Sequence, residues 1–207
     1  MNSLRLLLIR HGATNANVTN VLDSRPPGLP LSLEGRVQAA ALAEKLSTAQ
    51  IVGVYASLAT RAQQTADAIA ERHGLAVRVL KGVHEVQLGS WEGRRDLPTL
   101  NRYIETFTQW IEGDLDLRVP NGETGREVLS RYLCDVEMIR SEHTTGVVAL
   151  VSHGAAIRLA SLWLADNLDA GLVGANFIPN VGYIVLETVP STSRSWRCLE
   201  WIGTSLV

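Results

Sequence analysis

The chain has 207 residues, of which 46% are hydrophobic and 19% are charged. This length fits a single domain over residues 1–207, and the composition excludes an intrinsically disordered chain. A formal net charge of −2 excludes the chain-wide positive field that attracts nucleic acid or an anionic membrane, so we expect neither partner. Any site for an anion must therefore be built locally.

The first half of the chain alternates apolar runs with helical patterns. Residues 4–10 predict a buried strand that ends at an arginine, and residues 14–20 predict a short helix or turn. The prolines and glycine of 22–30 exclude a helix or an interior strand there. Ser32 is a typical N-cap for a following helix of about four turns. We expect the buried face of that helix to carry Val37, Ala40, Ala41, Ala43 and Leu46.

The next segments continue the alternation. Residues 51–57 form a short apolar run that is typical of a buried parallel strand. A helix is predicted over 59–73, with Ala62, Ala66, Ile69 and Ala70 facing inward and Gly74 as its C-cap. Residues 76–80 alternate as another strand.

The second half contains the most apolar strand. Residues 95–126 look less regular, and a helix is predicted over 127–142. A strand over 147–151 and a helix over 155–165 follow, and 181–187 and 195–202 look like closing strands. The alternation predicts an α/β fold with three layers, α/β/α, in which helices cover both faces of a mainly parallel sheet.

Three features of the sequence bear on the cellular location of the protein. Cys134 and Cys198 lack metal-ligand spacing, so we expect two unpaired, buried thiols in a reducing cytoplasm. The first apolar run is too short for the core of a signal peptide. Residues 147–165 are nearly long enough to span a membrane, but Arg158 would be costly inside it. We therefore expect a cytoplasmic protein and a strand followed by a buried helix.

Candidate functional groups follow three of the predicted strands. Arg10 and His11 follow the first strand, Ser57 through Arg61 follow the second, and Ser152 through Gly154 follow the most apolar one. Parallel α/β sheets bind ligands at the carboxyl ends of their strands. Each residue alone has an ordinary explanation as a turn histidine or a surface cation. Their repetition beside small residues, which leave backbone N–H groups free, favours an anion site.

Four motifs carry a family resemblance. They are R-H-G-A-T-N-A-N at 10–17, S-L-A-T-R-A-Q-Q-T-A at 57–66, H-E-V-Q-L-G-S-W-E-G at 84–93 and V-S-H-G-A-A-I-R at 151–158. In this order they resemble the histidine phosphatase superfamily, also called phosphoglycerate mutase-like. The resemblance covers nearly the whole chain.

The resemblance implies roles for five catalytic residues. His11 would be the nucleophile that forms a phosphohistidine, with its tautomer fixed by a backbone carbonyl. Arg10, Arg61 and His153 would surround the phosphoryl group and neutralise its charge. Glu85 would protonate the leaving alcohol; His84 and Glu92 are rival acids, but only Glu85 matches the motif position.

The resemblance also suggests phosphate contacts and points to departures. Candidate phosphate-binding residues are Gly12, Thr14, Asn17, Ser24 and Gly154, with Asn17 more convincing than Thr14. Ala13 stands where the family often has a polar residue. The loop 22–30, with Ser24 and Arg25, matches the family weakly. We expect residues 94–126 to be an insertion that covers the substrate; Arg94, Arg95 and Arg102 there are more readily explained as solvated.

The implied function is a metal-independent phosphomonoesterase that acts on a small phosphorylated metabolite without a cofactor. The nearest alternative is a bisphosphoglycerate-dependent phosphoglycerate mutase, although such mutases are typically longer and more basic around the site. A non-catalytic phospho-ligand binding protein would need no general acid such as Glu85. A metallohydrolase has little support, because the sequence has no H-E-x-x-H motif. The substrate and the oligomeric state stay open, a homodimer included.

Overall fold

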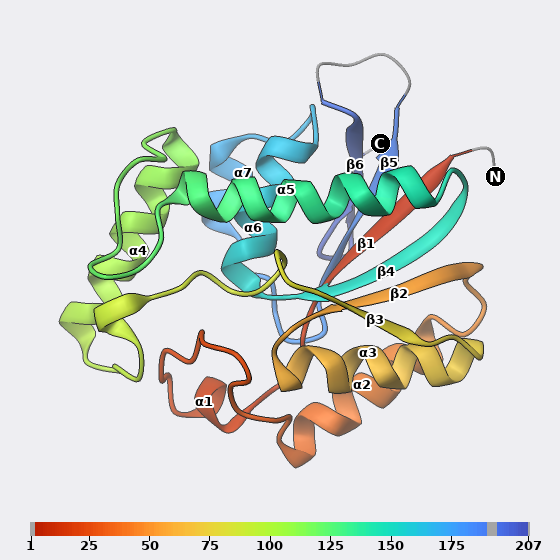
Figure 1. Cartoon of the computed structure of the whole chain (residues 1–207), viewed down its shortest axis with the longest axis horizontal. Helices are drawn as coiled ribbons and strands as arrows, with labels where there is room; N and C mark the ends of the chain where they lie inside the picture. Colours follow the sequence, from red (N-terminus) through yellow and green to blue (C-terminus); the bar gives the residue numbers. More distant parts are fainter. Residues whose placement is uncertain (1–2, 190–193, 207) are drawn as a thin grey trace.

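A seven-stranded sheet forms the centre of the computed structural model, which describes residues 3–189 and 194–206. Its order is β3-β2-β4-β1-β5-β6-β7 (Figure 1). The strands are β1 (Leu4–Arg10), β2 (Ile51–Ser57), β3 (Val77–Leu80), β4 (Gly146–Ser152), β5 (Tyr183–Thr188), β6 (Trp196–Trp201) and β7 (Thr204–Ser205). Strands β1 to β4 are mutually parallel, whereas β5, β6 and β7 each pair antiparallel with their neighbours. The expected mainly parallel sheet is confirmed.

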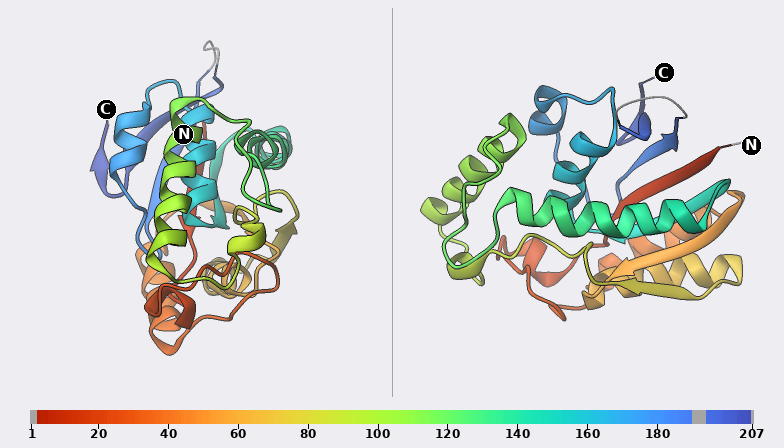
Figure 2. Two further views of the ribbon diagram at one scale, coloured as in Figure 1. Left: turned by 90° about the vertical axis from the view of Figure 1, so that its left-hand side faces the viewer. Right: turned by 45° about the horizontal axis from the view of Figure 1, so that its top comes forward.

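Helices cover both faces of the sheet, which confirms the three-layer architecture (Figure 2). They are α1 (Asn15–Val18), α2 (Leu33–Lys45), α3 (Thr60–His73), α4 (Leu97–Glu112), α5 (Gly125–Glu142), α6 (Gly154–Leu164) and α7 (Ala170–Ala175), with a short 3₁₀ turn, η1 (Gly89–Trp91). Helices α2 and α3 pack on one face, and α5 and α6 pack on the other. Helices α4 and α7 lie beyond α6. Each face has its own apolar core.

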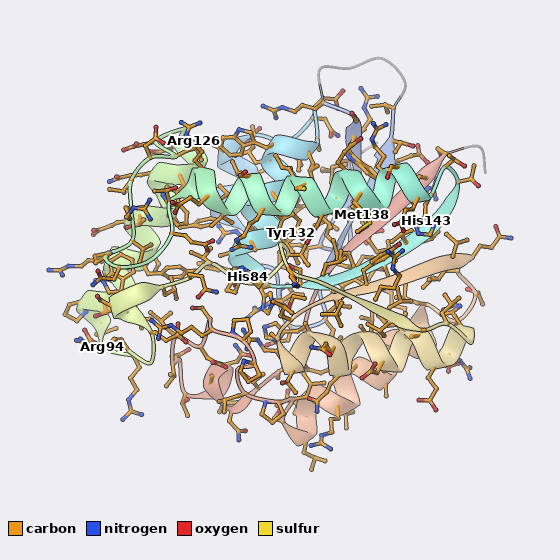
Figure 3. All side chains as sticks on the ribbon, viewed as in Figure 1. His84, Arg94, Arg126, Tyr132, Met138 and His143 are labelled. Atoms are coloured by element: carbon orange, nitrogen blue, oxygen red, sulfur yellow. The ribbon has the colours of Figure 1, made fainter. Side chains whose placement is uncertain are left out.

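The central strands explain the order of the sheet. Strands β1 and β4 are almost completely buried, as their continuous apolar sequences require. They pair in register from Leu4 opposite Gly146 to Arg10 opposite Ser152. Side chains from α5, such as Tyr132, fill the space between this helix and the strands (Figure 3). Because the carboxyl ends of β1 and β4 are aligned, the residues that follow the two strands lie side by side at the same edge of the sheet.

The ends of α2 and α3 were predicted well, but the buried face of α2 was partly wrong. Ser32 caps α2 by accepting a hydrogen bond from the Gly35 amide at 3.0 Å, and Gly74 ends α3 with φ +65°. Val37 is 64% exposed, and Ala40 and Ala41 are exposed as well. The buried residues are Gly35, Ala39, Leu42 and Ala43.

Gly35 explains why the buried face of α2 differs from the expected one. A Cβ at this position would lie 2.0 Å from the Ala13 carbonyl oxygen, so only glycine permits the observed contact with the segment after β1. An alanine-rich helix has apolar residues on several faces, and periodicity alone does not choose between them. The close approach to Ala13 selects the face.

The first half of the segment 95–126 is a regular helix, which corrects the expectation of irregular structure. Asp96 caps α4 by accepting from the Thr99 amide at 3.1 Å, and Gly113 ends the helix with φ +115°. Tyr103, Phe107 and Trp110 lie at helical spacing and belong to or pack against the core. These aromatic residues thus form one face of α4. Arg94, labelled in Figure 3, pairs with Asp96 at the start of this helix.

Three smaller expectations also have outcomes. Cys198 is buried as expected, but Cys134 is exposed because it lies on the outer side of α5. Residues 147–165 form β4 and α6, as expected. In the part of the chain that the structure describes, no helix has both the length and the apolar character needed to cross a membrane. Helix α7 and strand β7 were not predicted.

Candidate active site

The three strand ends singled out in the sequence meet at one edge of the sheet. Strands β2, β4 and β1 are consecutive in the sheet, so the residues after Ser57, Ser152 and Arg10 are neighbours. A cavity of about 530 Å³ opens at this edge. Arg10, His11, Arg61 and Glu85 line it, together with residues from α4, α6 and the segment before β5.

His11 is held as a neutral imidazole with one defined tautomer. Its side chain is buried, Nδ1 donates to the Gly12 carbonyl oxygen at 2.8 Å, and Nε2 accepts from Arg61 Nε at 3.0 Å. Burial lowers the pKa of His11 well below its usual 6.5, and the charge of Arg61 lowers it further. The unprotonated Nε2 therefore carries a lone pair beside a cation, as a nucleophile for phosphate requires.

Arg61 connects the two histidines of the site to the loop after α1. Besides His11, its guanidinium reaches Asp23, with Nη1 3.2 Å from Oδ2 and Nη2 2.9 Å from the backbone oxygen. Nη2 also donates to His153 Nδ1 at 3.3 Å. Burial lowers the pKa of Arg61, and the Asp23 carboxylate opposes that change. A Cβ at Gly28 would lie 2.3 Å from Arg61 Nη1, so the loop needs glycine there.

His153 lies behind Arg61 and, in the described part of the chain, is not one of the residues that line the cavity. Because its Nδ1 accepts from Arg61, its Nε2 donates to Ser57 Oγ at 2.6 Å. Its ring packs edge-on to His11 with 5.1 Å between centroids. Burial lowers the pKa of His153 well below 6.5, and the charge of Arg61 is the next cause. This histidine is therefore neutral and positions Arg61.

Arg10 presents an unsatisfied donor. Nη1 donates to the Ile178 carbonyl oxygen at 2.7 Å, whereas Nε is buried without a partner among residues 3–189 and 194–206. Gly154 lies beside it, where a Cβ would be 3.4 Å from that nitrogen. Burial lowers the pKa of Arg10. An unpaired, buried N–H on a cation is costly, and an anion in the adjoining cavity would satisfy it.

Glu85 lines the cavity at the beginning of α6. Its Oε1 accepts from the Val86 and Ala156 amides at 2.9 and 3.0 Å, and Oε2 accepts from the Ala155 amide at 3.3 Å. These amides hold the carboxyl group in one position in the lining of the cavity. The rival acids His84 and Glu92 do not line the cavity, and Glu92 instead binds the Ser24 amide and hydroxyl.

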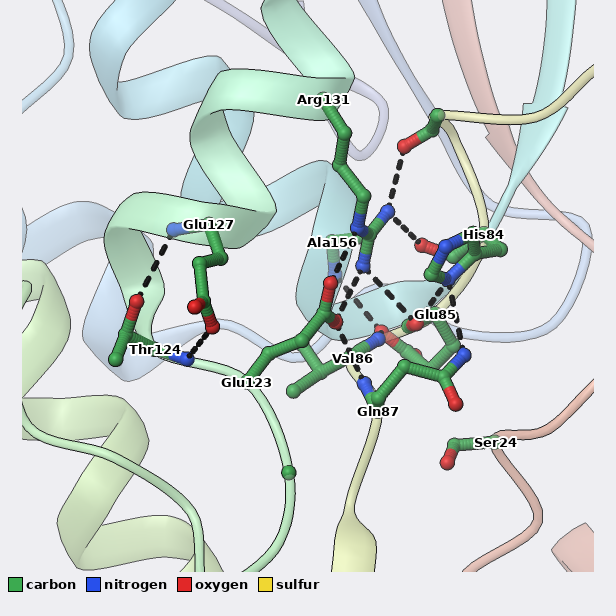
Figure 4. Close-up of polar contacts among 12 residues, drawn as sticks. Ser24, His84, Glu85, Val86, Gln87, Glu123, Thr124, Glu127, Arg131 and Ala156 are labelled. Atoms are coloured by element: carbon green, nitrogen blue, oxygen red, sulfur yellow. Dashed lines mark hydrogen bonds and ion pairs between the residues drawn. The ribbon is translucent and has the colours of Figure 1, made fainter.

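The loop that carries Glu85 is held by a partly buried arginine, paired with a glutamate, that the sequence did not reveal. Arg131 of α5 donates to the carbonyl oxygens of Gly82, His84 and Glu85 at 2.5, 2.7 and 3.1 Å (Figure 4). It also pairs with Glu123 at 2.7 Å. Arg131 lies far from the four motifs in sequence, so only the fold identifies it as a positioning residue.

The expected phosphate-binding residues differ in what they offer a ligand. Thr14, Asn17, Ser24 and Gly154 line the cavity, whereas Gly12 does not. Thr14 and Asn17 form a capping box on α1, in which Asn17 Oδ1 accepts from the Thr14 amide at 3.0 Å. No residue in the described ranges accepts from the side-chain nitrogen Nδ2 of Asn17, which leaves that donor for a ligand.

Gly12 and Ser24 are already engaged by the protein. The Gly12 amide donates to Thr65 Oγ1 at 3.0 Å, and a Cβ there would lie 2.6 Å from the Gly35 oxygen. The Ser24 hydroxyl donates to Glu92. Both residues therefore support the walls of the site in this structure.

Two further residues at the site were missed in the sequence. Asp23 lies between the prolines and the first motif, and its acidic character was the one available signal. Asn180 donates from Nδ2 to the His11 carbonyl oxygen at 3.0 Å and lies in a segment with no motif. Both contacts depend on how the loops fold around β1.

Comparisons with known proteins agree with this geometry. A glucosyl-3-phosphoglycerate phosphatase of Mycobacterium tuberculosis is 30% identical over 208 residues, which cover 97% of this chain and 93% of the relative. Phosphoserine phosphatase 1 of Hydrogenobacter thermophilus is 30% identical over 158 residues, covering 75% and 73%. A solved structure of mycobacterial glucosyl-3-phosphoglycerate phosphatase superposes with a TM-score of 0.82 at 27% identity, covering 98% of this chain and 100% of that one.

The family profile matches nearly the whole sequence. The profile of the histidine phosphatase superfamily, branch 1, aligns with residues 6–202 and so includes all four motifs and every strand from β1 to β6 except the first two residues of β1. With this match, the chain belongs to the histidine phosphatase superfamily (branch 1).

Proposed function

We propose that this protein is a phosphomonoesterase that hydrolyses a small phosphorylated metabolite through a phosphohistidine on His11. One observation carries the proposal: the lone pair of a neutral His11 and the unpaired Nε of Arg10 border the same cavity. A nucleophile and an unsatisfied cationic donor at one point match the needs of phosphoryl transfer. The phosphatases among the similar proteins support the same reaction class.

In the first step, His11 Nε2 attacks phosphorus while the bond from phosphorus to the ester oxygen breaks. Arg61 Nε, now 3.0 Å from Nε2, is placed to donate to an equatorial phosphoryl oxygen as the phosphoryl group arrives. Arg10 Nε and the side-chain Nδ2 of Asn17 donate to the other phosphoryl oxygens. The departing oxygen takes a proton from Glu85, so the alcohol leaves neutral.

In the second step, water attacks the phosphorus of phosphohistidine, and the Glu85 carboxylate takes its proton. The bond from nitrogen to phosphorus breaks, which returns His11 as a neutral imidazole and releases inorganic phosphate. The three amides around Glu85 keep the same carboxyl group in place for both proton transfers. The reaction needs no oxidant, reductant or second substrate apart from water.

The protein groups at the site supply this chemistry without a metal ligand set. Across the described ranges, no group of three or more histidine, cysteine, aspartate or glutamate side chains could hold a metal ion. We therefore propose that hydrolysis is metal-independent and expect full activity in excess chelator. Loss of activity in chelator, recovered by a divalent cation, would contradict this part of the proposal.

The central experiment measures release of inorganic phosphate from phenyl phosphate, together with rapid-quench trapping of acid-labile phosphoenzyme. We expect wild type to form phosphoenzyme and His11→Asn to form none. Glu85→Gln keeps the nucleophile and serves as the matched variant, with slow turnover of both steps. Equal hydrolysis by wild type and His11→Asn would overturn the mechanism. Interconversion of glycerate phosphates without phosphate release would identify a mutase instead.

A further inference from the structure

The cavity has two ends of different chemistry. The end at β1 carries the charged groups of the proposed reaction. The outer wall is largely apolar and comes from α4, from the loop after α1 and from the segment before β5. Its apolar side chains include Val21, Leu22, Leu100, Ile104, Phe177 and Ile178.

Two of these side chains are unusually exposed for their size. Phe177 is 66% exposed and Ile104 is 48% exposed, and both line the cavity rather than a distant surface. Isolated exposed apolar residues are common, but these adjoin buried apolar groups of the same cavity. A ligand that covers them would gain the free energy of removing this surface from water.

The ring of Phe177 is held in place before any ligand arrives. The guanidinium of Arg158, on α6, lies 4.6 Å from the Phe177 ring centre and 4.5 Å from that of Phe107. Arg158 Nε and Nη2 donate to the Val173 carbonyl oxygen at 3.0 and 2.7 Å. The cation–π contact therefore favours one orientation of the Phe177 ring in the lining of the cavity.

The same contacts limit how many hydrogen bonds Arg158 can donate to a second acidic group of a substrate, such as a carboxylate. In the described part of the chain, the cations that line the cavity are Arg10, Arg61 and Arg158. The first two lie at the proposed phosphate position, and Arg158 is 5% exposed, with two of its nitrogens engaged by backbone oxygens. The carboxylate of a short phosphorylated acid would thus lack a bidentate partner.

The size of the cavity agrees with its chemistry. Its volume of about 530 Å³ lies in the range of pockets that enclose drug-sized ligands, roughly 300–1,000 Å³. A cavity of this volume has room beside the phosphate for a group larger than a three-carbon acid. A larger apolar group would reach Phe177 and Ile104.

We propose that the alcohol part of the natural substrate is a bulky apolar or aromatic group, which packs against Phe177, Ile104 and Leu100 while its phosphate lies between Arg10 and Arg61. This inference rests on the proposed function and specifies its substrate class. Helix α4 then acts as the specificity wall, and Arg158 acts as a positioning residue for Phe177.

The test uses n-alkyl phosphates from ethyl to hexyl, because these leaving alcohols have similar acidity and differ mainly in apolar area. We expect kcat/KM to rise about threefold per methylene, which is within the range for burial of that group. Hexyl phosphate should exceed phosphoserine and 3-phosphoglycerate. Binding of the matching alkylphosphonates, measured by calorimetry, should show the same trend without any turnover.

Variants test whether the apolar residues that line the cavity, rather than exposed apolar residues elsewhere, cause the preference for long alkyl chains. Phe177→Ala and Ile104→Ser should each reduce the hexyl-to-ethyl ratio of kcat/KM about fivefold or more. Leu33→Ser is the matched control, because Leu33 is 82% exposed but lies on α2 outside the cavity lining. It should leave the ratio unchanged, and the thermal midpoint of each variant reports its folding.

The outcomes distinguish this inference from the function on which it rests. A flat alkyl series with measurable hydrolysis would overturn the apolar substrate class and leave the phosphatase mechanism intact. Preference for phosphoserine or 3-phosphoglycerate over hexyl phosphate would overturn it in favour of an acidic substrate held by Arg158. Tight binding of long alkylphosphonates with no hydrolysis of any ester would support the wall and overturn the proposed function.

Discussion

His11 and His153 have similar neighbours in the sequence but different surroundings in the fold. Each follows an apolar parallel strand and precedes a glycine, and the two strands are paired neighbours in the sheet. Both side chains are buried, and burial lowers the pKa of both well below 6.5. His11 nevertheless borders the cavity, whereas His153 lies behind Arg61.

The difference comes from the partners of each ring. The Gly12 carbonyl accepts from His11 Nδ1 and leaves Nε2 beside the cavity. Ser57 and Arg61 engage both nitrogens of His153. Arg61 also donates to His11 Nε2, so the two rings differ in that His11 lines the cavity and His153 does not. Two copies of a similar motif therefore fit two different proposed roles, a nucleophile at His11 and a positioning residue at His153, because one ring lines the cavity and the other lies behind Arg61.

The largest expected effect separates the two roles directly. We predict that His11→Asn lowers kcat by about 10⁴-fold or more, because the proposed covalent intermediate forms on the imidazole of His11. Circular dichroism should show a folded protein. Residual activity within tenfold of wild type would contradict the assignment of His11 as the nucleophile, and with it the proposed difference in role between His11 and His153.

Substitution of His153 should cost less. His153→Asn should lower kcat/KM about 10²- to 10³-fold, as loss of preorganised charge stabilisation does, while phosphoenzyme still forms slowly. The matched control is His143→Asn, since His143 also contacts a hydroxyl, that of Tyr55 at 2.8 Å, but lies at the C-cap of α5. The control should keep full activity. Complete loss of phosphoenzyme in His153→Asn would give this residue a direct chemical role.

A smaller change tests whether His153 acts through its orientation. Ser57→Ala removes the acceptor at 2.6 Å from His153 Nε2 and keeps the ring. Loss of one such hydrogen bond costs about 1 kcal/mol, so we expect roughly a fivefold fall in kcat/KM. Ser57→Thr, which restores a hydroxyl, should recover part of it. An unchanged rate in Ser57→Ala would show that Arg61 alone positions His153.

The smallest effect concerns stability and pH. The unfolded chain protonates its histidines near pH 6.5, whereas burial keeps His11 and His153 neutral to much lower pH in the folded protein. Below pH 6.5 the unfolded state therefore binds more protons, and the free energy of unfolding should fall as pH falls. Urea unfolding between pH 7.5 and 5.5 measures this dependence.

A double variant isolates the contribution of these two rings to that dependence. His11→Asn/His153→Asn has no ionisable group at either position, so its stability should fall less steeply over the same pH range. The single variants should lie between it and wild type. Identical slopes for wild type and the double variant would mean that the two imidazoles protonate normally in the folded protein.

Several parts of the fold were predictable because they depend on local sequence. The apolar runs of β1 and β4 require burial on both faces, which implies a covered parallel sheet. Ser32 and Gly74 mark helix ends by capping chemistry that involves only adjacent residues. Where the local signal was ambiguous, as on α2 and in α4, the predictions failed in part. Packing against Ala13 and the core resolved those cases.

By itself, the sequence determined the α/β class and placed Arg10, His11, Arg61, Glu85 and His153 after the strands or in the loops that converge at one sheet edge. Only the tertiary structure decided how those groups share their partners. Three contacts join segments that are separated in the chain: Arg61 donates to Asp23, Arg131 donates to Glu85 in its loop, and Arg158 lies over the ring of Phe177. Such contacts leave no periodic or local signal, because they arise from how loops meet after the sheet has formed.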